Sequence, residues 1–532
     1  MPEPESDAAS GTLARRASIV AGGTLVSRVL GFVREAVLAA VFPKEATDLF
    51  FLAFTIPNSL RMILAEGAVS AAVVPVFSEV QKAEGPDAAR AYLARIGGLF
   101  GLILLAISAV GVLAAPALVS VYAAGYVGRP ELFEPSVQLT RLLFPYIFFM
   151  GLTALGMGGL NAMRRFAVPA LTPALLNLAM IAAAFTLVGT AVRFGYPPIG
   201  ALAIGALIGG ALQMVAQWPA MQSAGILGPP RFDWRHPAVK KTVSLLIPLL
   251  AGFGIYQINT ALGRAIATMP WLPTGSQSYI WYGQRLVEIP QGVFGLAVGA
   301  AALPTLSDLR NAGDDARVRE VFGNSLSLIL FLGIPSAVGL AVFAEPIVSV
   351  AFARGQFGRA EALETAASLR WQALGVWAIA AVRTVVPMFF AYNDTRSPVM
   401  ASAVNLVVFA AMAIGLSFPF QHVGIAMALS AAGIAQLFAL LFLLRQRVGR
   451  LGLRRVVSRA TRASIAAAAM GATLFGIAQL GRWERGGNDP MNIALLLGGV
   501  VLALVVYLAV ARLVGSEDLA TLTAAVRRRA RR

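Results

Sequence analysis

Long apolar runs, separated by short polar segments, recur along the whole chain. A helix that crosses about 30 Å of hydrocarbon at 1.5 Å per residue needs about 20 such residues. Several runs exceed about 25 residues, which predicts tilt or extension beyond the bilayer. The pattern predicts fourteen membrane-spanning helices, near residues 18–41, 49–77, 96–124, 137–160, 168–192, 198–220, 242–268, 278–306, 321–352, 367–391, 399–418, 422–444, 463–481 and 491–514.

Composition supports an all-α integral membrane protein, because 58% of the 532 residues are hydrophobic and only 13% are charged. The net charge of +17 first suggests a nucleic-acid partner. However, most Lys and Arg residues fall in alternate connecting segments, on the side of the N-terminus. This asymmetry predicts that both termini are cytoplasmic and that the number of spans is even. It explains most of the charge, so no nucleic-acid partner is expected.

An internal repeat appears when the chain is shifted by about 229 residues. VPVFSE at 74–79 then aligns with LPTLSD at 303–308, and at a shift of 230 Pro116 and Gly125 align with Pro346 and Gly355. The shift corresponds to six spans, an even number, so the two halves have the same orientation. The repeat predicts two six-helix lobes in parallel orientation around a central cavity, with two extra C-terminal helices.

The predicted domains follow from the spans and the repeat. They are a cytoplasmic N-terminal segment, 1–17; an N-lobe of spans 1–6, 18–220; a cytoplasmic linker, 221–241; a C-lobe of spans 7–12, 242–450; spans 13 and 14, 451–514; and a basic cytoplasmic tail, 515–532.

Several spans carry charged residues that a lipid-facing helix should lack. Such a residue costs roughly 2.5 to 3.5 kcal/mol at the bilayer centre, so it usually faces a cavity or a partner. Within spans 1, 2 and 8 four arginines outnumber the three acids Glu35, Glu66 and Glu288, and guanidinium groups bind phosphate oxygens through bidentate, permanently charged donors. A phosphate or pyrophosphate is therefore the expected ligand. The candidate residues are Arg28, Arg34, Arg61 and Arg285, with the acids Glu35, Asp48, Glu66 and Glu288.

Helical spacing gives first expectations for pairing among these residues. Arg28 and Glu35 are seven positions apart and lie on one helical face, whereas Arg34 points about 120° away. Arg285 and Glu288 are three apart and are expected to pair on the helix surface. For any single residue, a buried ion pair that holds helices together is as plausible as a substrate-binding role.

Other chemistry is excluded or given a structural interpretation. The chain has no cysteine and only two histidines, so no zinc site, metal site or Ser/His/Asp relay is expected, and we predict neither an enzyme nor a cofactor. GALIGGAL at 205–212 lacks a Walker lysine and predicts close helix packing. Asn393 and Asp394 predict a turn and helix cap.

Several motifs resemble those of the MurJ (MviN) lipid II flippase family, within the multidrug/oligosaccharidyl-lipid/polysaccharide exporter superfamily. The similarity extends through twelve spans. The matching segments are SRVLGFVRE at 27–35, ATDLFFLAF at 46–54, IPNSLR at 56–61, AEGAVSAAVVP at 65–75, FPYI at 144–147, NAMRRFAVPA at 161–170, YGQRLVEIPQGVFG at 282–295 and NDTRSP at 393–398.

The resemblance implies a flippase that moves lipid II, the undecaprenyl-pyrophosphate-linked peptidoglycan precursor, to the outer leaflet of the bacterial cytoplasmic membrane by alternating access. It implies that the four arginines engage the pyrophosphate, that the acids act at gates or in the cavity, and that spans 13 and 14 help to form a groove for the lipid tail. Proteins of cell-wall synthesis are a further expected class of partner.

Two departures from the family pattern affect these implications. Glu35 stands where the family usually has Asp, and span 7 contains no acid, which puts ion coupling in question. The alternatives are a flippase for another polyprenyl-linked glycan, a multidrug exporter of the same superfamily, and a non-transporting cell-wall scaffold. A cavity for cationic drugs should carry surplus carboxylates, the reverse of the pattern here.

Overall fold

A computed structural model describes residues 5–65, 68–252, 254–294, 308–310, 312, 314–392, 394–449 and 451–530. Contacts between helices divide the chain into two compact units, Met1–Met269 and Pro270–Arg532. The first unit includes the segment 242–267, which the sequence analysis assigns to the C-lobe. The assignment of lobes and domains to residue ranges stays a prediction.

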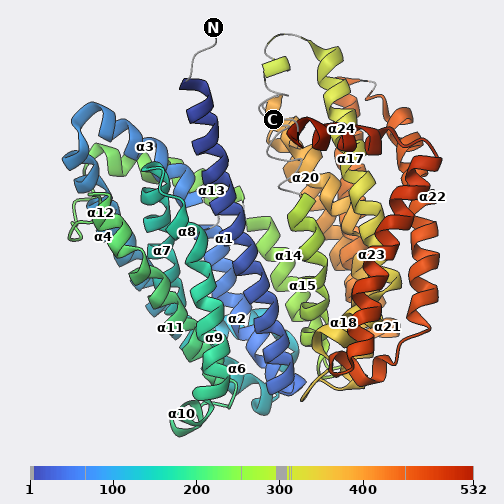
Figure 1. Cartoon of the computed structure of the whole chain (residues 1–532). Coiled ribbons are helices and arrows are strands. Elements are labelled where there is room, and N and C mark those ends of the chain that lie inside the picture. The colour runs from blue at the N-terminus through green and yellow to red at the C-terminus, as the bar shows by residue number, and fades with distance from the viewer. Residues whose placement is uncertain are drawn as a thin grey trace. The chain divides into compact units, whose positions relative to one another are not determined.

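The first unit consists of helices in the part of the chain that the structure describes (Figure 1). The helix α1 runs beside α8 and α9, and α2 packs on α6 and α7. The helices are α1 (Glu5–Val41), α2 (Lys44–Ala65), α3 (Ala68–Glu84), α4 (Pro86–Leu113), α5 (Ala115–Tyr122), η1 (Ala124–Tyr126), α6 (Pro130–Leu143), α7 (Tyr146–Ala162), α8 (Ala167–Leu171), α9 (Pro173–Thr186), α10 (Val188–Arg193), α11 (Gly200–Ala216), α12 (Trp218–Ser223), α13 (Pro237–Gly252) and α14 (Gly254–Ala267).

The second unit is also helical, and its last helix, α24, runs across the direction of α17 and α22 (Figure 1). Tyr507 of α23 joins two of its helices, since its hydroxyl donates a 2.6 Å hydrogen bond to the Phe331 carbonyl of α17. The helices are α15 (Ser276–Phe294), α17 (Asp315–Val342), α18 (Ala344–Phe352), α19 (Arg359–Ala373), α20 (Val376–Ala391), α21 (Arg396–Val448), α22 (Leu453–Ala478), η3 (Trp483–Asn488), α23 (Pro490–Leu513) and α24 (Glu517–Ala530).

The predicted all-α membrane fold is confirmed. Among the described residues, eight helices are long and apolar enough to cross a membrane, or nine if the bent pair α19 and α20 forms one span. The helices α1, α2 and α15, which carry the candidate charges, are not among the eight. Their charged residues lower the mean hydropathy, as expected for helices that face something other than lipid.

Several predicted continuous spans are broken helices. The span near 137–160 is formed by α6 and α7, which are separated at Phe144 and Pro145. Near residue 420 the prediction holds, because the spans predicted at 399–418 and 422–444 are two helices that meet within the element α21. Gln421 has φ 52° and ψ −135° and so turns the chain inside α21. The hydropathy pattern found the break, but the two segments join without an intervening loop.

The internal repeat corresponds to a repeated order of elements in the two units. In the first unit α4 is followed by the short helix α5, a turn, and then α6 and α7; in the second, α17 is followed by α18, a turn, and then α19 and α20. Each turn contains one of the aligned glycines, Gly125 in η1 and Gly355 beside the bridge between Arg354 and Phe357. Repeated sequence thus produces the same local structure within each unit.

Glycines allow α11 to pack directly on α9. A Cβ atom built on Gly205 would lie 2.6 Å from the Ala183 Cβ, and one on Gly209 would lie 2.8 Å from the Leu176 Cα. Both distances are shorter than real carbon contacts allow. The close helix packing that the sequence predicts for 205–212 is therefore confirmed.

We expect Gly209→Val to destabilise the first unit, because the new side chain would push against the α9 backbone. Overpacking of this kind costs about 1 to 3 kcal/mol. The thermal unfolding midpoint of the purified protein in detergent measures the effect. Gly498→Val in α23 is the matched control, since nothing lies within 4 Å of a Cβ at that position. Equal midpoints for the two variants would contradict the expectation.

Asp394 caps the first turn of α21, as the sequence predicts. Its carboxylate accepts 3.0 Å hydrogen bonds from the backbone N–H groups of Arg396 and Ser397, and a 2.8 Å bond from the Ser397 hydroxyl. The Arg447 guanidinium lies 3.3 Å from the same carboxylate. The Ser397 backbone bond is the main cause that lowers the pKa of Asp394, so the carboxylate stays ionised. Asn393 lies outside the described residues.

Candidate functional site

Arg34 and Glu35 form an ion pair on α1 next to α9. The Arg34 Nη2 donates to the Glu35 Oε1, and the Arg34 Nη1 donates a 3.0 Å hydrogen bond to the Asn177 Oδ1. The side chains of Arg34 and Glu35 are only 12% and 2% exposed. Asn177 Nδ2 in turn donates to the Ser27 carbonyl at 3.1 Å. The result is a buried polar network between two apolar helices.

Glu35 pairs with Arg34, although the helical spacing places Glu35 on the same face as Arg28. Arg28 is exposed, whereas Glu35 is buried and its carboxylate accepts from Arg34, its direct neighbour in the sequence. A long Arg side chain can bend around the helix, so the direction of its Cβ does not fix the position of its guanidinium. Asn177 was missed at the sequence level, although a single Asn in the apolar run 174–184 indicates a buried hydrogen-bonding role.

Arg61 lies on α2, one turn after Pro57. Its Nε donates a 2.8 Å hydrogen bond to the Asn58 Oδ1, and the side chain is half-buried. Arg34 and Arg61 both act electrostatically on the hydroxyl of Tyr146, a fully buried residue of α7. Both arginines therefore lie in the neighbourhood of Tyr146 within the first unit. Arg28 lies on α1 as well, with its side chain exposed.

Asp48 lies near the other end of α2 from Arg61. It is buried in the first turns of α2, thirteen residues before Arg61, which is about 20 Å along a helix. Burial raises the pKa of Tyr126 in η1, the nearby Asp48 carboxylate raises it further, and Arg129 lowers it. Asp48 therefore lies with the loop that follows α5, at the opposite end of the unit from Arg61. Glu66 lies outside the described residues.

The same end of the first unit is closely packed. The Gly125 N–H donates a 3.3 Å hydrogen bond to the Thr268 hydroxyl, and a Cβ on Gly125 would lie 2.0 Å from the Thr268 carbonyl oxygen. The turn after α5 is thus fixed against the residue that follows α14. Asp48 and Tyr126 are both buried at this end of the unit.

Arg285 is the predicted arginine of the second unit, on α15. Its Nη1 lies 2.9 Å from the Glu288 Oε2, which confirms the expected pairing at i and i+3. The Arg285 guanidinium carbon also lies 4.5 Å from the centre of the Trp281 ring, a cation–π contact. The arginine is held between a carboxylate and an aromatic face, while 31% of its side chain stays exposed.

Trp281 was missed at the sequence level. It lies four residues before Arg285 and so occupies the same helical face, a spacing at which an aromatic ring and a cation can meet. Only 5% of Trp281 is exposed, so its ring is fixed by packing. A fixed ring limits the directions in which the guanidinium can move.

Arg34 and Arg285 share one feature that sequence reasoning cannot detect. In each, the Nε–H is buried and has no hydrogen-bond acceptor among the described residues. A buried unsatisfied donor costs about 1 to 3 kcal/mol, and more when charged. Each unit therefore contains an arginine that is held by a neighbouring carboxylate and retains a donor for a further oxygen.

Comparison with solved structures defines the class of protein first. The chain resembles an inward-facing multidrug resistance MATE family transporter of the MOP superfamily, with a TM-score of 0.64 over 80% of this chain and 95% of that one; at 13% identity this likeness shows the fold alone. It is more similar to a lipid II flippase MurJ in an inward closed conformation, with a TM-score of 0.75, 25% identity, and coverage of 93% and 98%. The fold is that of a multi-span membrane transporter.

Sequence comparison then gives the family. The family model for lipid II flippase MurJ matches residues 38–486. A probable lipid II flippase MurJ of Vibrio cholerae is 34% identical over 93% of this chain and 95% of the relative, and a lipid II flippase MurJ of Burkholderia cenocepacia is 34% identical over 73% and 75%. This chain belongs to the lipid II flippase MurJ family.

Proposed function

We propose that this protein moves lipid II from the inner to the outer leaflet of the cytoplasmic membrane, and that Arg28, Arg34, Arg61 and Arg285 bind its pyrophosphate. Membership of the flippase family supports the substrate. The observation that carries the site is that Arg34 and Arg285, two of the intramembrane arginines, are each paired with a carboxylate and have a buried Nε–H without an acceptor among the described residues, a state that Arg95 and Arg459 also show. A pyrophosphate offers several charged oxygens to such donors.

The two ion pairs suggest how binding is coupled to movement. Glu35 and Glu288 occupy the arginines in the state described here, so an arriving pyrophosphate competes with them. The Nε atoms have almost no exposed surface, and the guanidinium groups must rotate before they can donate to a phosphate oxygen. Substrate and carboxylates therefore favour different side-chain positions. This difference is what a ligand needs in order to shift a conformational equilibrium.

The remaining elements of the proposal concern topology and transport. These residues catalyse no covalent reaction. The protein transports by alternating between a state open to the cytoplasmic side of the membrane and a state open to the outer side. Both termini lie in the cytoplasm, as the distribution of Lys and Arg supports. Glu66 and Asp48 serve at gates or in the cavity, and α22 and α23 contact the lipid tail. Proteins of cell-wall synthesis are its neighbours in the membrane.

Transport of labelled lipid II by the purified protein tests this function. The protein is reconstituted into liposomes, and lipid II in the outer leaflet is detected with a membrane-impermeant reagent. We expect translocation faster than in empty liposomes and competition by unlabelled lipid II but not by a cationic drug. If another polyprenyl-linked glycan competes as strongly as lipid II, the proposal that lipid II is the specific substrate is wrong. A translocation rate equal to that of empty liposomes would refute transport.

A further inference from the structure

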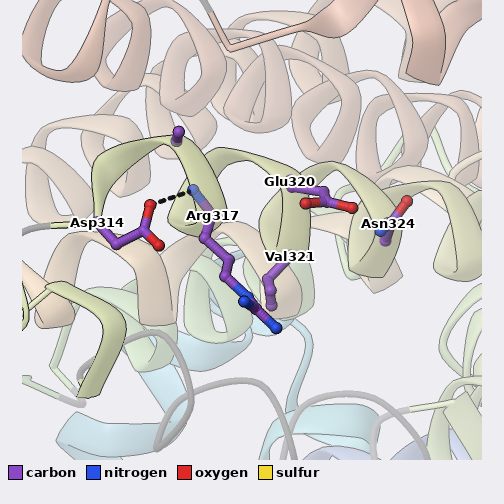
Figure 2. A pocket seen from close by; sticks show the side chains of 6 residues that line it. Asp314, Arg317, Glu320, Val321 and Asn324 are labelled. Carbon is purple, nitrogen blue, oxygen red and sulfur yellow. Dashed lines mark hydrogen bonds between the residues drawn. The ribbon is translucent and has the colours of Figure 1, made fainter.

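A basic cavity lies between the first turns of α17 and α22, in the second unit. Its volume is about 280 Å³, and it is lined by the arginines Arg319, Arg455 and Arg459, together with Glu320 and Asn324. A neighbouring cavity of about 370 Å³ along α17 shares Glu320 and Asn324 with it. Figure 2 shows this second cavity, with Glu320 and Asn324 along α17 and Arg317 extending away from the helix. None of the predicted substrate residues lines either cavity.

Arg459 forms the fixed part of the basic cavity. It is 9% exposed, and its Nη1 donates a 2.9 Å hydrogen bond to the Asn324 Oδ1 and lies 3.5 Å from the Asp518 Oδ1. Its Nη2 also pairs with the Glu517 carboxylate. These bonds join α17, α22 and the crosswise helix α24, so the cavity has a wall built from three helices.

The other two arginines, Arg455 and Arg319, have hydrogen-bond donors available for a ligand. Arg455 donates one 3.0 Å hydrogen bond to the Glu517 Oε2, while 66% of its side chain is exposed. Arg319 is half-buried, and the structure gives it no hydrogen bond or ion pair within the described ranges. The hydrogen bonds from Arg459 and Arg455 lower the pKa of Glu517, which keeps that carboxylate charged and Arg459 in place.

The charge and position of the cavity select a class of ligand. Glu517 and Asp518 neutralise Arg459, so the guanidinium donors left for an anion are those of Arg319 and of the largely exposed Arg455. The arginines lie within the first two turns of two apolar helices, Ala316–Val342 and Leu453–Ala478, where phospholipid headgroups are expected. The distribution of Lys and Arg predicts that this end is cytoplasmic. Glu320 can accept a hydrogen bond from an ammonium or hydroxyl substituent on the same ligand.

We propose that this cavity is a second ligand site, distinct from the proposed lipid II site, which binds a phosphate group through Arg319 and Arg455. The phosphate belongs to a phospholipid headgroup with a hydrogen-bond donor, or to a free phosphate ion. At about 280 Å³ the cavity is just below the range of about 300 to 1,000 Å³ for ligand pockets, which suits a headgroup with its acyl chains outside. Bound there, the ligand bridges α17 and α22.

Binding to purified full-length protein in neutral detergent tests the site. The probes are short-chain phosphatidylglycerol, short-chain phosphatidylcholine and inorganic phosphate, and native mass spectrometry and thermal unfolding measure binding. We expect phosphatidylglycerol to bind and to raise the unfolding midpoint, and phosphatidylcholine, which lacks a donor for Glu320, to bind less. Loss of charge-assisted hydrogen bonds predicts about 10- to 100-fold weaker phosphatidylglycerol binding in the variant with Arg319→Gln and Arg455→Gln.

Arg454→Gln is the matched control for Arg455→Gln, because it removes the same charge one position away, from an exposed residue that does not line the cavity. It should bind like the wild type. Arg455→Gln alone serves if the double variant fails to fold, since the side chain is largely exposed. Equal stabilisation by inorganic phosphate would assign the site to free phosphate. Wild-type binding by the arginine variants, or an equal loss in Arg454→Gln, would overturn the proposal.

Discussion

We expect Arg285→Ala to reduce lipid II translocation by about 10- to 100-fold in proteoliposomes. The substitution removes a guanidinium that is fixed against Trp281 and Glu288 and retains a buried donor. Each charge-assisted hydrogen bond contributes about 1.5 to 3 kcal/mol, and 1.4 kcal/mol corresponds to a factor of ten. The rate of lipid II translocation at equal protein content measures the effect, with complementation of a flippase-depleted strain as a second readout.

Two further variants show whether charge or geometry matters at this position. Arg285→Lys keeps the charge but loses the planar fork and the stacking on Trp281, so an intermediate rate is expected. Arg454→Ala removes an exposed arginine from α22 and should transport like the wild type. An unchanged rate for Arg285→Ala, with normal insertion, would remove Arg285 from the proposed site.

The second prediction concerns stability: a single substitution should destabilise the protein more than a double substitution that includes it. We expect Glu35→Ala to destabilise the protein more than Arg34→Ala and Glu35→Ala combined. Glu35→Ala leaves the Arg34 charge largely buried without its carboxylate, and loss of one partner of a buried pair costs about 3 to 5 kcal/mol. The double variant removes both charges. Thermal unfolding in detergent, completed as a double-mutant cycle with Arg34→Ala, measures the difference.

Glu35→Gln provides the matched control, since it keeps an oxygen acceptor for Arg34 while it removes the negative charge. Its unfolding midpoint should lie between those of the wild type and Glu35→Ala. If the double variant proves less stable than Glu35→Ala, the pair does not act as a charge-compensated unit. In that case the network through Asn177 would be the main stabilising contact of Arg34.

Much of the site could be predicted from local sequence, but the partners could not. The pair Arg285 and Glu288 follows from a three-residue spacing on one helix, and the cap at Asp394 follows from its neighbours. The hydrogen bond between Arg34 and Asn177 of α9 could not be predicted in this way, because the two residues are 143 positions apart in the sequence. Asp48 and Arg61 lie on the same helix, but about 20 Å apart along it.

The sequence by itself determined the membrane class, the all-α fold, the repeat and the arginine-rich set, because hydropathy, spacing and charge act locally along a helix. Only the tertiary structure decided that α6 and α7 separate at Phe144 and Pro145, that Glu35 pairs with Arg34, and that Arg34 and Arg285 have an Nε–H without an acceptor among the described residues. It also created the cavity between α17 and α22, which joins residues more than 100 positions apart. These features depend on which helices pack together, and that choice is made by shape and burial across the whole unit.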